Sequence, residues 1–160
     1  MRIYLPATLP LLEQWLEAGK AEVTTAYAVT PTLREWYREA DLDELEHAAQ
    51  LDASVGSLEL LAADAGAPRR RVVVAADIEE SAVTAAYGSG RAVLRLSGPV
   101  AVSRWGSALV DDPDADLVVT RAIASLAGAA RGEDDAQFDL GEAEAYELGW
   151  YAVQELRYLA

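Results

Sequence analysis

The only histidine of the chain, His47, is the first side chain to consider for catalysis or metal binding. It follows Glu44 by three residues, a spacing that places both on one helix face, as in carboxylate-bridged di-iron sites. Such a site needs a second copy of the motif, which the sequence lacks, and the chain has no cysteine for a conventional zinc or iron–sulfur site. We therefore expect no metal and no cofactor, and interpret His47 as a partly exposed helical residue.

The run Asp111–Asp116, which contains four aspartates, looks at first like a calcium-binding loop. Asp112, Asp114 and Asp116 occupy the first, third and fifth positions of such a loop. The sixth position holds Leu117 where glycine is required, and the twelfth holds Ile123 where a glutamate is required. Carboxylates are common before and within the first turn of a helix, because they accept hydrogen bonds from free N–H groups. The run therefore indicates the beginning of a helix.

Arg69, Arg70 and Arg71 form the one basic cluster of a chain whose net charge is −14. Such a cluster can bind phosphate or the carboxylates of a partner. It can equally be the solvated entry to a strand, paired with nearby acidic side chains. The overall negative charge repels phosphate backbones and anionic lipids, so we expect no membrane partner and regard nucleic acid as a poor candidate. Phosphate-ligand or nucleic-acid binding through Arg69–Arg71 is the weakest of three functional hypotheses.

Adjacent aromatic residues, Trp36-Tyr37 and Trp150-Tyr151, are candidates for a binding surface. Both pairs fall in segments that we predict to be helical. Neighbours in a helix are about 100° apart, so one ring of each pair must point partly outward. Glu155 lies near the second pair. We name these five residues, together with Arg69–Arg71, as candidates for binding or for an interface.

Sequence motifs of common enzyme classes are missing. The chain has no glycine loop ending in Gly-Lys-Ser/Thr, no dinucleotide-binding glycine fingerprint and no serine in a Gly-x-Ser-x-Gly elbow. Its 27 acidic residues could supply the two carboxylates of a hydrolase, but no spacing singles out a pair. Four glutamates lie near aromatic residues in the sequence and are noted for that reason alone: Glu35, Glu39, Glu147 and Glu155. No residue is therefore assigned a catalytic role, and we favour a protein that is not an enzyme.

Hydrophobic spacing and capping residues predict the elements that position these side chains. The run Val72–Ala76 is typical of a central strand covered on both faces. Other strands are expected at Arg2–Leu5, Glu22–Val29, Arg91–Leu96 and within Val100–Val110. Helices are expected after Thr8, after Thr30-Pro31, after Asp41, from Asp112-Pro113 to Ala130, and from a capping box at Asp139 and Glu142 onward.

This order of elements predicts one α+β domain over residues 1–160. We expect a mixed β-sheet of about four to five strands with helices packed mainly on one face, and a ferredoxin-like core is one option. The helix Leu117–Ala130 is apolar on most of its surface, so the C-terminal helix or a second subunit must cover it.

Four segments, Leu33–Tyr37, Val72–Asp77, Val110–Asp112 and Trp150–Leu156, resemble a family of small uncharacterised actinobacterial proteins. The resemblance covers nearly the whole chain. The family has no established activity, so no catalytic residue is carried over. The resemblance implies an intracellular protein from a high-GC bacterium.

The leading hypothesis is a non-catalytic cytoplasmic interaction or accessory protein. It would form a homodimer, or bind a protein partner, through the helix Leu117–Ala130 or the Trp150-Tyr151 surface. The cytoplasm is the expected compartment because the chain has no cysteine, no apolar signal segment and no long apolar run. The second hypothesis is a small enzyme that uses paired carboxylates in a pocket between sheet and helices.

Overall fold

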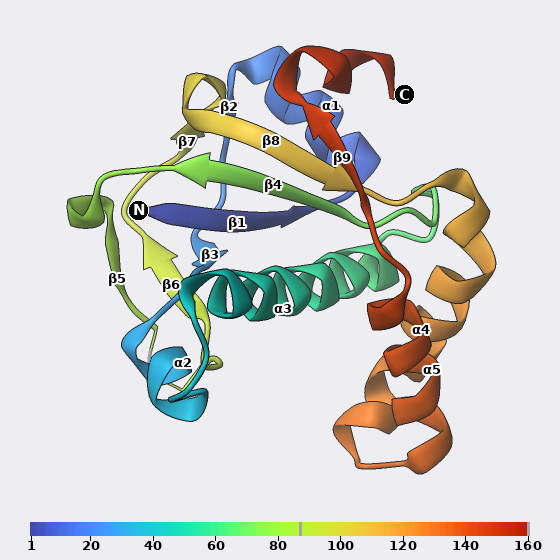
Figure 1. The fold of residues 1–160 in the computed structure, drawn as a ribbon. Helices are drawn as coiled ribbons and strands as arrows, with labels where there is room; N and C mark the ends of the chain where they lie inside the picture. The colour runs from blue at the N-terminus through green and yellow to red at the C-terminus, as the bar shows by residue number, and fades with distance from the viewer. Residues whose placement is uncertain (87, 160) are drawn as a thin grey trace.

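A computed structural model describes residues 1–86 and 88–159, in which an antiparallel seven-stranded sheet has the order β5-β6-β3-β1-β4-β8-β9 (Figure 1). Its strands are β1 (Arg2–Ala7), β3 (Thr25–Tyr27), β4 (Val72–Asp77), β5 (Val83–Ala85), β6 (Val93–Leu96), β8 (Trp105–Val110) and β9 (Gly149–Ala152). A second, two-stranded sheet pairs β2 (Lys20–Ala21) with β7 (Val100–Ala101). The α-helices are α1 (Leu9–Ala18), α2 (Pro31–Trp36), α3 (Leu42–Ala63), α4 (Asp116–Ala130) and α5 (Asp134–Ala145). Short 3₁₀ helices are η1 (Glu80–Ala82), η2 (Val102–Arg104), η3 (Pro113–Ala115) and η4 (Val153–Tyr158).

The α+β class is confirmed, but the sheet differs from the predicted one. It has seven strands rather than four to five, and every pair in it is antiparallel rather than mixed. The additional strands lie at the two edges, where β5 has 3 residues and β9 has 4. Strands this short carry too little alternation to be identified from sequence. A ferredoxin-like core remains a prediction.

The predicted helix starts are confirmed where a side chain caps the helix locally. Thr8 accepts a hydrogen bond from the backbone N of Leu11 at 3.3 Å, and Thr30 accepts one from Leu33 at 3.1 Å. Asp41 likewise accepts from the backbone N of Glu44 at 2.9 Å and begins α3. These bonds involve residues three apart, so the sequence alone contains the signal.

The C-terminal segment does not follow the prediction. Asp139 lies inside α5, which begins at Asp134 and ends at Ala145, and the chain then forms β9 and η4. Trp150 and Tyr151 therefore lie on a strand, paired with Leu109 and Ala108 of β8. Aromatic residues favour strands, and a neighbouring strand with a free edge decides the outcome here. Adjacent strand residues point to opposite faces, so the two rings are separated by the sheet.

Helices cover both faces of the sheet, which corrects the expectation of a single covered face. In Figure 1, α1 and η4 lie above the sheet and α3 lies below it. The upper cluster contains Ile3, Leu5, Val72 and Val74 from the sheet, Leu12 and Trp15 from α1, and Leu156 from η4. The lower cluster contains Tyr4, Val73 and Ala75 from the sheet, with Leu45, Ala49 and Ala53 from α3. Alternation along β1 and β4 thus supplies two separate cores.

The apolar helix α4 is covered by its neighbours within the chain. It packs against α5 and against the C-terminal half of α3, in a cluster that includes Leu61, Val119 and Ala143. Two large apolar side chains of this hairpin stay exposed, Leu117 at 60% and Phe138 at 66%. Of the helices within the described residues, none has the length and apolar character needed to cross a membrane.

Candidate functional site

A buried ion pair joins two neighbouring strands at one end of the sheet. Arg71 directly precedes β4 and Asp111 directly follows β8, and the register Val72 to Val110 brings the two side chains together. Arg71 Nε donates to Asp111 Oδ2 at 2.7 Å and Nη2 donates to Oδ1 at 2.9 Å. Their side chains are 1% and 0% exposed. A two-pronged arginine–carboxylate contact of this kind fixes the relative orientation of both groups.

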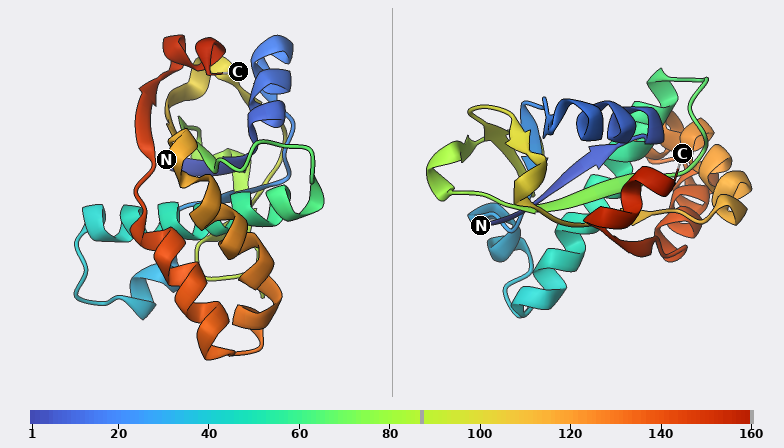
Figure 2. Two further views of the ribbon diagram at one scale, coloured as in Figure 1. Left: turned by 90° about the vertical axis from the view of Figure 1, so that its right-hand side faces the viewer. Right: turned by 90° about the horizontal axis from the view of Figure 1, so that it is seen from above.

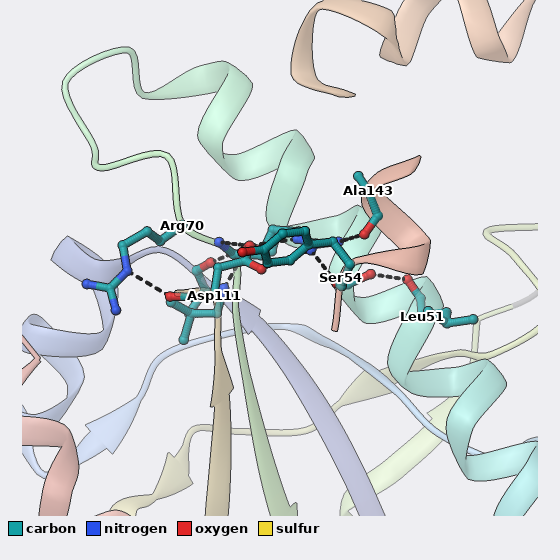
Figure 3. A network of polar contacts seen from close by, with 10 residues as sticks. Leu51, Ser54, Arg70, Asp111 and Ala143 are labelled. Carbon is teal, nitrogen blue, oxygen red and sulfur yellow. Dashed lines mark hydrogen bonds and ion pairs between the residues drawn. The ribbon is translucent and has the colours of Figure 1, made fainter. Parts of the chain in front are cut away.

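The same guanidinium holds the chain that leaves α5. Arg71 Nη1 donates to the carbonyl oxygen of Ala143 at 2.7 Å, and Nη2 donates to that of Tyr146 at 2.9 Å (Figure 3). The last carbonyls of a helix have no partner within the helix, so a cation placed there satisfies them. Arg71 therefore sets the position of residues 144–148, which connect α5 to β9.

A groove of about 220 Å³ lies between α3 and this connection, on the lower face of the sheet; we call it the α3–β9 groove. Its floor is apolar and comes from Val73 of β4 and Leu109 of β8. The complete lining is His47, Gln50, Leu51, Ser54, Val73, Leu109, Glu144, Tyr146, Glu147 and Leu148. The groove has an apolar base and polar side chains on both walls, as small-molecule sites commonly do.

Trp150 extends the floor of the α3–β9 groove toward the edge of the sheet. It lies directly across from Leu109, and opposite residues of an antiparallel pair share one face. Exposure increases from Val73 at 1%, through the half-buried Leu109, to Trp150 at 63%. Tyr151 lies on the other face, against the upper cluster. The groove is thus continuous with an exposed indole on an edge strand.

Burial affects the titration of one side chain beside the groove. Tyr4 of β1 is 2% exposed and packs against α3, and its hydroxyl donates to Glu46 Oε2 at 2.9 Å. Removal from water raises the pKa of Tyr4 to about 12, and the neighbouring Glu46 carboxylate acts in the same direction. Tyr4 is therefore a neutral hydrogen-bond donor throughout the physiological pH range, and it fixes α3 to β1.

The predicted arginine cluster is divided among three structural roles. Arg69 Nη1 donates to the carbonyl of Leu61 at 2.8 Å at the end of α3. Arg70 Nε donates to the carbonyl of Asp111 at 2.8 Å. With Arg71 buried, the structure does not bring the three guanidinium groups to one surface.

Three other predicted residues lie outside the α3–β9 groove. Trp36 ends α2 and is 60% exposed, with the guanidinium carbon of Arg91 3.4 Å from its ring centroid. Tyr37 follows it and is 46% exposed. Glu155 is an exposed residue of η4. Of the aromatic and acidic residues noted from the sequence, Glu147 lines the groove and Trp150 lies beside it, opposite Leu109.

Sequence reasoning did not identify the groove residues Gln50, Ser54 and Glu144. Two groove residues were considered for chemistry, His47 for its residue type and Glu147 for its place near aromatic residues in the sequence, but nothing connected them to one site. The groove forms where β9 pairs with β8, and we expected β9 to be helical. The alternation of Leu109 and Trp150 with their neighbours is the one signal that would have placed them on a common face.

The aspartate run behaves as a helix start at all but one position. Asp112 accepts a hydrogen bond from the backbone N of Asp114 at 3.0 Å, as capping predicts. Asp111 does not take part, because it binds Arg71, and this corrects its assignment to the helix start. Within residues 1–86 and 88–159, no group of three or more histidine or acidic side chains is placed to hold a metal ion.

The family model described as "Family of unknown function (DUF6912)" matches residues 1–160. This match agrees with the resemblance to an uncharacterised family. No curated protein and no solved structure matches the chain.

Proposed function

Since the chain belongs to the family of unknown function DUF6912 along its whole length, we propose a function from the structure: a non-catalytic interaction protein that self-associates through β9. The observation that carries this proposal is Trp150, 63% exposed on a strand at the edge of the sheet. The cysteine-free composition is compatible with the cytoplasm, which is the compartment we propose.

The free edge of β9 lacks the features that usually prevent strands from pairing with other chains. Its sequence Gly149-Trp150-Tyr151-Ala152 has no charge and no proline. Natural edge strands are commonly protected by lysine, proline or a bulge. β9 is the last strand of the sheet order, so no strand of the described residues pairs with its outer edge, and the left view of Figure 2 shows it along one side of the sheet. The edge is therefore open to a second strand.

Pairing with a second copy makes use of this edge and of Trp150 together. An antiparallel β9–β9 pair has a two-fold axis, and such an axis makes the same patch serve both subunits. Residues directly opposite share a face, so Trp150 of each copy lies on the same side of the joined sheet. Each indole would then cover the other, which removes two large apolar surfaces from water.

Light scattering coupled to size-exclusion chromatography tests the proposal. At about 50 µM the wild-type chain is expected to be a dimer, and Trp150→Ala a monomer. Trp36→Ala is the matched control, because Trp36 is exposed to nearly the same extent, 60%. It is expected to leave the dimer intact. A monomeric wild type, or equal effects of the two substitutions, would overturn the proposal.

A hydrolase with paired carboxylates is the second candidate, and Glu144 and Glu147 of the α3–β9 groove are the pair that favours it. Both side chains are exposed. A general acid that works near neutral pH needs a desolvated carboxyl with a raised pKa. Their exposure therefore favours binding over catalysis. Turnover of a panel of chromogenic esters and glycosides that is lost in Glu144→Gln and Glu147→Gln would reverse this order.

A further inference from the structure

The α3–β9 groove has a floor suited to an apolar group. Val73 is fully buried between the sheet and α3, and Leu109, Leu51 and Leu148 are half-buried around it. When a ligand covers half-buried leucines that line an open hollow, apolar surface is removed from water and the free energy of binding becomes more favourable. The hollow of about 220 Å³ is smaller than the pockets of drug-sized ligands, so its occupant is a small molecule.

The carboxylates of the groove outnumber its basic groups. Glu144 and Glu147 both contribute to the lining, which contains no lysine or arginine and one histidine, His47. Neither glutamate belongs to an ion pair among the described residues. With a net charge of −14, the rest of the chain adds to the negative potential. An anionic ligand is therefore repelled and a cation is attracted.

The wall that carries the two glutamates is built before any ligand arrives. Arg71 fixes the carbonyls of Ala143 and Tyr146, which lie on either side of Glu144. On the opposite wall, Ser54 is 3% exposed and donates to the carbonyl of Leu51 at 2.7 Å (Figure 3). Its oxygen keeps a lone pair with which it can accept a hydrogen bond. A pre-formed site has less conformational entropy to lose on binding.

From this arrangement we infer that the α3–β9 groove binds a small protonated amine that carries an apolar or aromatic group. The apolar part lies on Val73 and Leu109, and the ammonium group lies at the mouth beside Glu144 and Glu147. The inference uses the groove alone and does not depend on self-association.

An NMR titration of the ¹⁵N-labelled full chain with 2-phenylethylamine at pH 7 and low salt tests the inference. Shift changes are expected in residues 47–54, 109 and 144–148, with a Kd of the order of 1 mM. The neutral 2-phenylethanol is expected to bind about tenfold more weakly, because it has the same ring without the charge. Phenylacetate, with the opposite charge, is expected to cause no change in these residues.

Substitution of the carboxylates gives the second measurement. The double variant Glu144→Gln/Glu147→Gln is expected to bind 2-phenylethylamine about tenfold more weakly, since each exposed ion pair contributes a few-fold. Glu142→Gln is the matched control, because Glu142 lies on α5 but lines a different hollow. It is expected to bind like the wild type.

Three results would overturn the inference: no shift changes in the groove at about 10 mM amine, equal affinity for amine and alcohol, or unchanged binding by the double variant. The titration is repeated with Trp150→Ala to separate the two proposals. The monomer expected for Trp150→Ala should still bind the amine. Amine binding by a wild-type chain that is monomeric contradicts only self-association, and a wild-type dimer that does not bind the amine contradicts only this inference.

Discussion

The upper face of the sheet is closed by α1 and η4, whereas the lower face is left open over β8 and β9. On the upper face, the rings of Trp15 and Trp105 meet edge to face with centroids 6.2 Å apart. On the lower face, α3 contacts β1, β3 and β4, and Trp150 of β9 is 63% exposed. A helix is about 10 Å wide and strands are about 4.8 Å apart, so one helix covers roughly two to three strands.

The comparison shows that the open region results from geometry rather than from poor packing. On the lower face of the seven-stranded sheet, α3 contacts β1, β3 and β4, and the short α2 adds Leu33 to the same cluster, so these two helices leave the β8–β9 edge uncovered. Residues 144–148 line one side of the groove there, and no further helix of the described residues covers the strands. Binding and association are therefore expected on the lower face, and stability is expected to depend most on the buried ion pair and the upper core.

The largest expected effect concerns the ion pair that supports this side of the groove. Asp111→Ala leaves the buried Arg71 guanidinium without its carboxylate, which is expected to lower the free energy of unfolding by about 3–5 kcal/mol. Urea unfolding at pH 7 measures the change. Asp112→Ala is the neighbouring control and removes a cap, at about 1 kcal/mol. A loss below about 1 kcal/mol for Asp111→Ala would show that the pair is not essential to the fold.

Two leucines test whether the faces differ in packing. Leu12→Ala removes a fully buried side chain from the upper core, with an expected loss of about 2–5 kcal/mol. Leu109→Ala removes a half-buried side chain from the groove floor, and the expected loss is about 1 kcal/mol because part of that surface already meets water. Both losses are measured by urea unfolding. Equal losses would contradict the description of the lower face as open.

Salt is expected to strengthen dimerisation through the open edge of β9. Each subunit carries a net charge of −14, so two copies repel each other at low ionic strength. Screening reduces this repulsion, and dimerisation through Trp150 is expected to tighten about tenfold between 0.05 and 0.5 M NaCl. Sedimentation equilibrium at the two salt concentrations measures the change. Dimerisation that weakens with salt would instead indicate contacts between opposite charges.

The smallest expected effect comes from an exposed ion pair between β1 and β4. Arg2 Nε donates to Asp77 Oδ1 at 2.9 Å, and this contact lowers the pKa of Asp77 below its ordinary value. The stabilisation is present above the unfolded-state pKa and disappears as the pH falls through the lower folded-state pKa. Asp77→Asn is therefore expected to lose less than about 1 kcal/mol at pH 7, and still less in strong acid. Urea unfolding at the two pH values provides the test. A larger loss of stability in acid than at pH 7 would contradict the predicted pH dependence of the ion pair.

Prediction from the sequence succeeded where the signal is local. Thr8, Thr30 and Asp41 cap helices through bonds to residues three positions ahead. The β-branched run of β4 lies at the centre of the sheet, buried on both faces. Prediction failed at β9, because a four-residue strand is stable only when a neighbour such as β8 pairs with it.

The candidate site was beyond sequence reasoning for the same reason. Arg71 and Asp111 are 40 residues apart, and nothing in the local sequence distinguishes Arg71 from Arg69 and Arg70. Glu144 and Glu147 are ordinary acidic residues until the Arg71 contacts place them beside α3. Three residues in or beside the groove were noted in advance without being connected: His47 and Trp150 for their residue type, and Glu147 for its place near aromatic residues.

The sequence by itself determined the acidic charge, the helix starts capped by Thr8, Thr30 and Asp41, and the central apolar strand, because composition, capping and periodicity act over a few residues. The tertiary structure alone decided which arginine is buried, which face of the sheet stays open and where Trp150 lies. Those outcomes depend on strand pairing between distant segments, and on the limited width that α2 and α3 can cover on a seven-stranded sheet.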